Sequence, residues 1–244
     1  MLSVIVPTAW AFKPFCNFLS NVVELPVVGE VIIINNVVER TPKHPVLSHS
    51  KVRVYNQDKN IFVNPAWNLG VSYASNDKIC ILSDDVLVDL RVFFEADKFV
   101  NKQIGTLAIG IHFDLYRAQN DQFELVNDVK NLVVDGDIKI KEFGPNVNMS
   151  GSGSLFFLDK ENWVNIPNEF KVNWGDTWQF KMQECFARKN YFINNCFYYT
   201  PWSMAVKTGI SCDYQSGEEY KKYENSDYFN LAVENHLKDV NHGR

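Results

Sequence analysis

The sequence has 244 residues, with 24 Lys and Arg against 29 Asp and Glu, so its formal net charge is −5. Its content of 46% hydrophobic and 22% charged residues is that of a globular protein and excludes a disordered or fibrous chain. The acidic balance and the absence of a Lys/Arg block argue against a nucleic-acid-binding protein.

Three further features bear on location. No apolar run approaches the roughly 18–20 residues that span a bilayer, and residues 1–7 lack the basic region of a signal peptide. Five scattered cysteines without a CxxC pair are typical of reduced thiols. We therefore expect a cytoplasmic protein with no transmembrane segment; the sequence does not indicate its oligomeric state.

The first half of the chain alternates apolar runs with amphipathic stretches. It predicts strands over residues 3–6, 30–34, 52–55, 79–82 and 106–111, with helices over 12–23 and 65–74. Asn64 and Pro65 form the N-cap and first-turn pair expected for the second helix. Strand and helix at this spacing predict an α/β fold, a mostly parallel sheet flanked by helices.

The second half is less regular. Residues 132–140 predict a small antiparallel hairpin turning at Asp135-Gly136. An apolar strand is expected over 155–158, a helix over 177–188 and a strand over 191–199, followed by a polar, tyrosine-rich tail. No linker is visible, so we expect a single domain over residues 1–244 with the hairpin and tail as additions.

Polar side chains follow three of the predicted strands, at Pro7-Thr8, Asn35-Asn36 and Ser83–Asp85. Parallel strands place their carboxyl ends at one edge of the sheet, where ligands bind. Adjacent carboxylates such as Asp84 and Asp85 repel one another, and a Mg²⁺ or Mn²⁺ ion bound with phosphate oxygens would offset that repulsion. The alternative is a solvated Asp-Asp turn that caps the next helix.

With these residues in view, the chain resembles the GT-A glycosyltransferases, in particular the inverting, family 2-like group. The resemblance runs from residue 2 to about residue 201. Six segments carry it in family order: SVIVPT (3–8), EVIIINN (30–36), NIFVNPAWNLG (60–70), ICILSDDV (79–86), GSGSLFF (151–157) and PNEF (167–170) with NWGD (173–176).

The resemblance implies a Rossmann-like GT-A domain, with a nucleotide-sugar half at about 1–112, an acceptor half at about 113–210 and a tail at about 211–244. It implies transfer of a sugar from a nucleotide-diphosphate sugar, with UDP- and GDP-sugars as the first candidates. The acceptor would be a hydroxyl of a glycan or glycoconjugate. The reaction would proceed with inversion and be assisted by Mn²⁺ or Mg²⁺.

The resemblance also assigns roles to single residues. Thr8 and Asn35, with Asn36 beside them and Pro7 shaping the loop, would line the nucleobase pocket. Asn68 would lie on the helix beside the nucleotide, Asp84 near the ribose and diphosphate, and Asp85 with Asp84 at the metal. Asp176 would be the general base on the acceptor hydroxyl, and its alternative role is the N-cap of the following helix.

Several positions depart from the family pattern or stay open. Ser83 stands where the family has the first Asp of its DxD motif, and Gly175 stands beside Asp176 where an acidic residue is usual. Lys207 takes the place of a late family His and would serve as a cation at the diphosphate, or be a surface lysine. Trp10 would stack on the base or belong to the core.

Two other functions remain open at this stage. One is a nucleotidyltransferase, although residues 8–13 contain no glycine for the phosphate loop such an enzyme needs. The other is a sugar-nucleotide or glycan-binding protein of the same fold without turnover. Trp174 and Trp178 flank Asp176 and are expected to form apolar walls around it.

Overall fold

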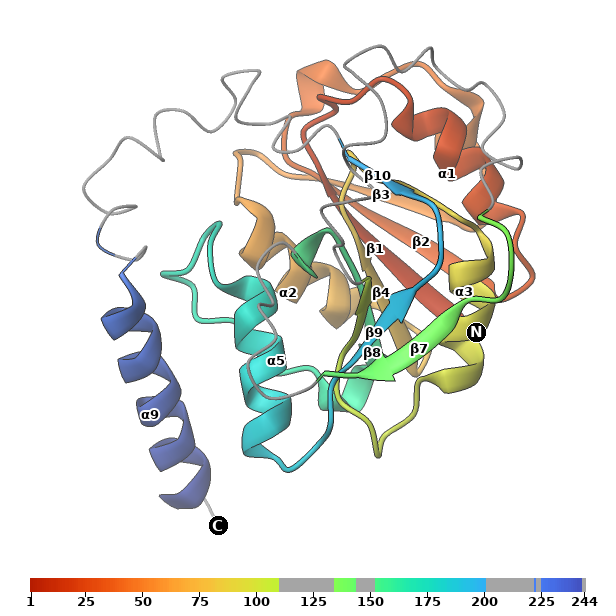
Figure 1. Cartoon of the computed structure of the whole chain (residues 1–244). Coiled ribbons are helices and arrows are strands. Elements are labelled where there is room, and N and C mark those ends of the chain that lie inside the picture. The colour runs from red at the N-terminus through yellow and green to blue at the C-terminus, as the bar shows by residue number, and fades with distance from the viewer. Residues whose placement is uncertain (110–133, 144–151, 201–221, 223–224, 243–244) are drawn as a thin grey trace.

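A computed structural model describes residues 1–109, 134–143, 152–200, 222 and 225–242 of the chain (Figure 1). The predicted sheet is present, and its strands order as β3-β2-β1-β4-β8-β6-β9-β7. Their bounds are β1 (Leu2–Thr8), β2 (Val28–Asn35), β3 (Val52–Asn56), β4 (Lys78–Leu82), β6 (Leu107–Ile109), β7 (Lys139–Glu142), β8 (Leu155–Asp159) and β9 (Tyr191–Asn194).

The first four strands are the parallel half of the sheet. β1 pairs in parallel with both β2 and β4, and β2 pairs in parallel with β3. β8 then runs antiparallel to β4 and β6, and β7 runs antiparallel to β9. Both faces of β1 are buried, which explains why its sequence reads as a continuous apolar run.

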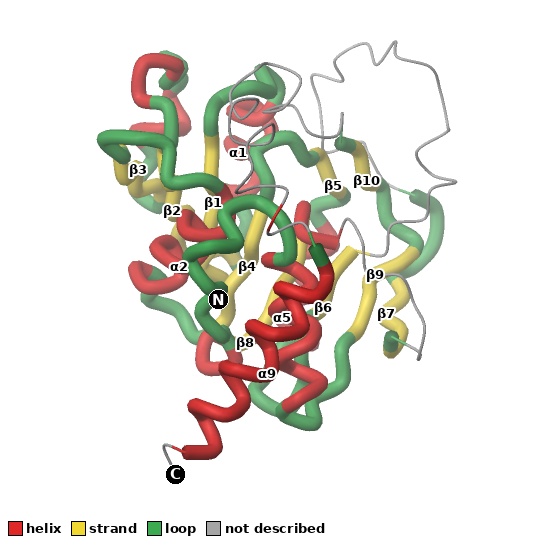
Figure 2. Tube along the Cα trace, turned by 90° about the vertical axis from the view of Figure 1, so that its left-hand side faces the viewer, coloured by secondary structure: helices red, strands yellow, loops and turns green. Residues whose placement is uncertain are grey.

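Helices cover both faces of this sheet (Figures 1 and 2). On one face α1 (Phe15–Val23) and α3 (Arg91–Phe99) bury Phe18 and Phe93 against alternate residues of the strands. On the other face lie α2 (Val63–Tyr73), α5 (Gly175–Cys185) and α9 (Ser226–His242). Strand residues alternate between the two cores because successive side chains point to opposite faces.

Some predicted boundaries move for identifiable reasons. α1 starts after Pro14 and not at residue 12, because a proline disfavours helical geometry in the residue before it. The strand expected over 191–199 divides into β9 and β10 (Tyr198–Tyr199), with Asn195 at a positive φ of 59° between them. β10 pairs with β5 (Leu87–Val88) in a small antiparallel sheet.

Other expectations were wrong or only partly visible. Asn64 is not the N-cap of α2, since the helix begins at Val63 and Phe62 takes the N-cap position at a φ of 65°. Among the described residues, β7 pairs antiparallel with β9. Residues 132 and 133 of the expected hairpin lie outside the described residues. Helices α3 and α9 were not expected. In the tail, Phe229 and Val233 form the buried stripe of a helix.

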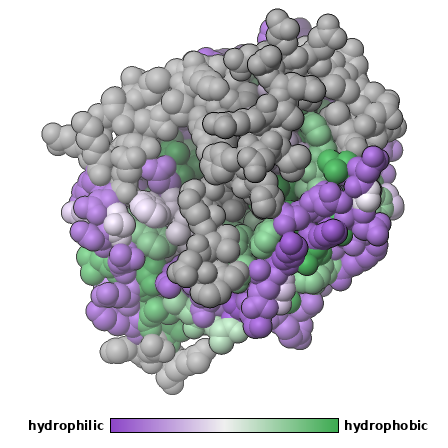
Figure 3. Space-filling view, viewed as in Figure 1, coloured by the Kyte–Doolittle hydropathy of each residue, from purple (hydrophilic) through white to green (hydrophobic). Residues whose placement is uncertain are grey.

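β7 is one edge of the sheet, and three of its four residues are exposed. Its sequence, Lys-Ile-Lys-Glu, appears as a hydrophilic band across the lower right of the face in Figure 3. Charged side chains on an edge strand oppose pairing with another chain. Within the described residues, no helix is both long and apolar enough to cross a bilayer.

Candidate active site

The three polar strand ends meet at one edge of the sheet, as predicted. Thr8 lies opposite Asn35 in the β1–β2 register, and its hydroxyl donates a hydrogen bond to Asp84 Oδ2 at 2.5 Å. The backbone N–H of Ala9 donates to the same carboxylate oxygen at 3.2 Å. Pro7 is buried within β1, and its register partner in β2 is Ile34. The end of β1 and the turn after β4 are therefore joined through one carboxylate.

Burial dominates the electrostatics of Asp84. Burial, and after it the negative charge of Asp85, raise the pKa of the Asp84 carboxyl to about 6. Hydrogen bonds from Thr8, Ala9 and the backbone N–H of Trp10 oppose this rise. A cation between the two carboxylates would remove the repulsion that contributes to this high pKa.

Asp84 and Asp85 suit a hard divalent cation that retains other oxygen ligands. Thr8 and Ala9 both donate to the same Asp84 oxygen, Oδ2. The described residues contain no cluster of three or more His, Cys, Asp or Glu side chains around a common point. An ion held here would need phosphate or water ligands, as Mg²⁺ and Mn²⁺ commonly do.

Trp10 and Asn35 form a hydrogen-bonded hub beside this cluster. Trp10 has a left-handed φ of 56°, and its indole N–H donates to Asn35 Oδ1 at 2.8 Å. Asn35 is fully buried, and its amide donates to Thr41 Oγ1 and Asn56 Oδ1, each at 2.8 Å. Both amide N–H groups are thus used inside the protein. In this structure Asn35 supports the loop and offers no donor to a ligand.

A cavity of about 580 Å³ opens next to this hub, beyond the carboxyl ends of β2 and β3. It is lined by residues 36–40 and 56–60. Asn36 lies in its wall, and the Asn36 side-chain oxygen accepts a hydrogen bond from the backbone of Ile61. The volume falls within the range of about 300–1,000 Å³ that is usual for small-molecule sites.

Asp176 reaches the same edge from the other half of the chain. It lies in the first turn of α5, where its Oδ1 accepts the Thr177 N–H at 2.8 Å. It also lies against Gly153, on which a Cβ would stand 3.2 Å from the carboxylate carbon. The next residue, Ser154, accepts the Ser83 N–H at 2.8 Å. The turn at 152–154 therefore joins Asp176 to the turn that carries Asp84 and Asp85.

Burial also raises the pKa of the Asp176 carboxyl, against the lowering effect of N–H groups from Thr177 and Gly153. Asp176 is not the N-cap of α5, because Trp174 occupies that position. Trp178 is fully buried, and the apolar walls around Asp176 stay a prediction. Both Trp174 and Trp178 contact Phe229 of α9, and the Trp174 ring stacks on the Phe229 ring with 5.0 Å between the ring centroids.

Asn68 and Lys207 complete the predicted set. Asn68 Nδ2 donates to the Ile166 carbonyl at 2.8 Å, and its Oδ1 accepts N–H groups from Ile166 and Trp163. Its amide is therefore engaged in joining α2 to a neighbouring loop. Lys207 lies outside the described residues.

The sequence did not identify one residue that contributes to this site. Asn64 is fully buried on the first turn of α2 and holds the loop that precedes Asp176. A polar side chain one turn before Asn68 was the available signal, but it was interpreted as a helix cap.

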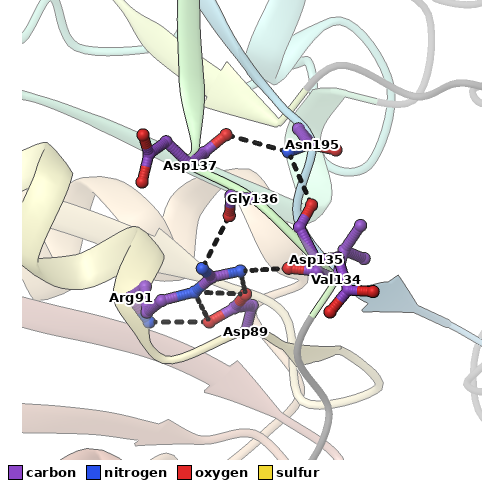
Figure 4. Close-up of polar contacts among 7 residues, drawn as sticks. All are labelled: Asp89, Arg91, Val134, Asp135, Gly136, Asp137 and Asn195. Atoms are coloured by element: carbon purple, nitrogen blue, oxygen red, sulfur yellow. Dashed lines mark hydrogen bonds and ion pairs between the residues drawn. The ribbon is translucent and has the colours of Figure 1, made fainter.

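An ion pair and its hydrogen bonds join the segment after Asp85 to residues 134–137 (Figure 4). Arg91 forms a salt bridge with the buried Asp89 at 2.7 Å and donates to the carbonyls of Val134 and Gly136. Asn195 donates to the neighbouring carbonyls of residues 135 and 137. These contacts bind the segment that follows Asp85 to two distant parts of the chain.

Comparisons with known proteins support the fold. Neither a family model nor a curated protein matches the sequence. Among solved structures, residues 1–349 of TarS from S. aureus are 15% identical, with a TM-score of 0.50 over 82% of this chain and 60% of that one. The longer TarS structure gives 15% identity and a TM-score of 0.51, over 91% of this chain and 41% of that one.

A third likeness is to the mannosyltransferase PcManGT from Pyrobaculum calidifontis, solved with GDP-Man and Mn²⁺. It is 14% identical, with a TM-score of 0.52 over 78% of this chain and 53% of that one. The chain thus spans about 40–60% of the length of these structures. Its mixed sheet and these likenesses show that the chain has a GT-A fold.

Proposed function

We propose that this protein is a glycosyltransferase that moves a sugar from a nucleotide-diphosphate sugar to a hydroxyl group of a glycan or glycoconjugate. The observation that carries the proposal is the convergence of Asp84, Asp85 and Asp176 at one sheet edge, beside a cavity of nucleotide size. PcManGT, whose fold is similar, was solved with GDP-Man and Mn²⁺.

In this proposal the donor nucleotide occupies the cavity at 36–40 and 56–60, with Asn36 in its wall and Thr8 at the neighbouring strand end. Asp84 and Asp85 would hold Mn²⁺ or Mg²⁺, and such an ion would supply a Lewis acid for the charge on the leaving diphosphate. Lys207 is proposed as a further cation there. The Trp10 hub holds the β1 loop in shape.

Asp176 acts on the acceptor side. As the acceptor oxygen attacks the anomeric carbon and the bond to the diphosphate breaks, Asp176 takes the hydroxyl proton. A carboxylate whose pKa is raised by burial is a stronger base than an exposed carboxylate. A single displacement with one base inverts the anomeric centre. We further propose that the nucleotide-binding and acceptor-binding halves belong to a single domain.

The test is a thermal-shift series with UDP- and GDP-sugars, each with and without Mn²⁺. We expect one donor to raise Tm only when the ion is also present, because ligands that bind the native state stabilise it. Asp85→Ala should lose that rise, whereas Asp227→Ala, which removes an exposed carboxylate on α9, should keep it.

Turnover is then measured as release of nucleoside diphosphate in the presence of candidate glycan acceptors. A metal-dependent shift with no turnover on any acceptor would favour a binding protein of the same fold. Formation of a nucleotide sugar from nucleoside triphosphate and sugar phosphate would instead indicate a nucleotidyltransferase. Absence of any donor shift would refute the proposal.

A further inference from the structure

A buried side chain from another helix holds the segment just before Asp176. Asn64, on α2, is fully buried, and its Nδ2 donates to the carbonyls of Phe170 and Asn173 at 2.7 and 2.8 Å. Its backbone N–H donates to the Lys171 carbonyl at 3.1 Å. One residue therefore provides three hydrogen bonds to a four-residue loop that is more than 100 positions away in sequence.

Immediately after this loop the backbone adopts a costly shape. Trp174 has a left-handed φ of 68°, which costs an L-residue roughly 1–2 kcal/mol. Such a conformation persists only where the surroundings hold it. The loop at 170–173, held by Asn64, supplies that constraint on the N-terminal side of Trp174.

Gly175 then passes directly over Asn64. A Cβ at position 175 would stand 2.1 Å from Asn64 Oδ1 and 2.6 Å from the ring of Trp67. Any side chain there would force α2 and the start of α5 apart. This close approach explains the glycine at a position where the resemblance led us to expect an acidic residue.

The Asn64 oxygen itself is unusual. It is buried and has no hydrogen-bond partner, a state that typically costs about 1–3 kcal/mol. An apolar side chain would fill the same space without that cost. What an apolar side chain lacks is the pair of N–H groups that hold Phe170 and Asn173.

We propose that Asn64 is the positioning residue for Asp176, and that with Gly175 it sets the start of α5 so that the Asp176 carboxylate lies against Gly153. This inference rests on the proposed role of Asp176 as the base for the acceptor hydroxyl. Asn64 touches no reacting group itself, and it acts through the 170–175 segment.

The first test compares Asn64→Ala with Asn162→Ala. Asn162 is the matched control, because it is also buried and its Nδ2 also donates to two backbone carbonyls, those of Lys102 and Ile104, in a loop that does not lead into α5. We expect Asn64→Ala to lower kcat by about 10- to 100-fold, since small misplacements of a reacting group have effects of that order. The KM for the donor should change less than about threefold in both variants.

A second readout does not depend on turnover. The pKa of the Asp176 carboxyl is measured by ¹³C NMR, with Asp176→Asn to assign the signal. When the 170–175 segment relaxes in Asn64→Ala, water reaches the carboxylate and its pKa should fall toward the ordinary value. In Asn162→Ala the pKa of the Asp176 carboxyl should match the wild type.

A double-mutant cycle covers the case in which Asn64→Ala does not fold. Gly175→Ala alone should lower kcat strongly, because the new methyl group meets Asn64 Oδ1. Asn64→Ser shortens that side chain, so Gly175→Ala should be less harmful in the Asn64→Ser background. Strict additivity of the two changes would overturn the proposed contact.

The two proposals fail in different ways. If Asp176→Asn keeps wild-type turnover, the role of Asp176 as base is wrong whatever Asn64 does. If Asp176→Asn is inactive while Asn64→Ala retains both the wild-type kcat and the wild-type carboxyl pKa, the positioning role of Asn64 is wrong.

Discussion

The two adjacent carboxylates at the end of β4 should make the ligand-free wild type less stable than a variant that carries only one of them. Asp84 is partly buried, next to Asp85, and its pKa is raised to about 6. Replacing it by Asn keeps the shape and an oxygen that accepts from Thr8 and Ala9. The new amide removes the ionised group and offers a donor toward Asp85. We therefore expect Asp84→Asn to stabilise the protein.

The expected size follows from the change of pKa on folding. A carboxyl whose pKa moves from 3.8 to about 6 corresponds, at about 1.4 kcal/mol per pKa unit, to about 3 kcal/mol at neutral pH. This is an upper limit, because solvent screens a side chain that is only partly buried. The pKa of Asp84 is higher in the folded state than in the unfolded state, so the wild type loses this stability as pH rises through about 4 to 6. Asp84→Asn has no carboxyl group at this position and does not lose stability in this way.

The assay is urea unfolding of wild type and Asp84→Asn at pH 4.5 and pH 7.5, without divalent ions. We expect a gain of about 1–3 kcal/mol at pH 7.5, or up to about 10 °C in Tm, and most of it should vanish at pH 4.5. Asp227→Asn, at an exposed position, should show no such pH dependence. An equal effect at both pH values, or a loss at pH 7.5, would refute the reasoning.

Three further predictions concern the base, the hub and the C-terminal helix. Asp176→Asn should lower kcat about 10²- to 10⁴-fold and leave the metal-dependent donor shift intact. In the wild type, kcat should fall with decreasing pH as Asp176 is protonated. This fall should occur above the usual pH range of carboxyl groups, because burial raises the pKa of Asp176. Steady-state kinetics across pH would check both. Trp10→Phe keeps a ring but loses the N–H bonded to Asn35, so urea unfolding should show a loss of about 1 kcal/mol and the donor should bind more weakly. Phe229→Ala removes the ring that contacts Trp174, and hydrogen exchange should then show lost protection along α9, with about 3–5 kcal/mol less stability.

The local pattern of the sequence was sufficient for the parallel half of the fold. Continuous apolar runs ended by polar residues predicted β1, β2 and β4, because strands buried on both faces leave no polar position until they reach the sheet edge. The juxtaposition of Thr8 with Asp84 followed from the same reasoning, since parallel strands bring their carboxyl ends together.

Tertiary contacts decided the rest. Helix α9 has only a narrow apolar stripe. That stripe is buried because its Phe229 packs on the rings of Trp174 and Trp178, more than 50 residues earlier in the chain. Asn35 looked like a ligand-binding amide, but the loop carrying Thr41 and strand β3 use both of its N–H groups. Hydrogen bonds between distant segments cannot be inferred from residue types in a single sequence.

Asn64 and Gly175 show the same division most clearly. The sequence by itself determined that an asparagine precedes Pro65 and that a glycine precedes Asp176, and local rules interpreted these residues as a cap and as a lost acidic residue. Only the folded chain brings the two within contact distance, across 111 positions. A local pattern reports what neighbours along the chain favour, whereas a close approach between backbone and side chain depends on how two helices meet.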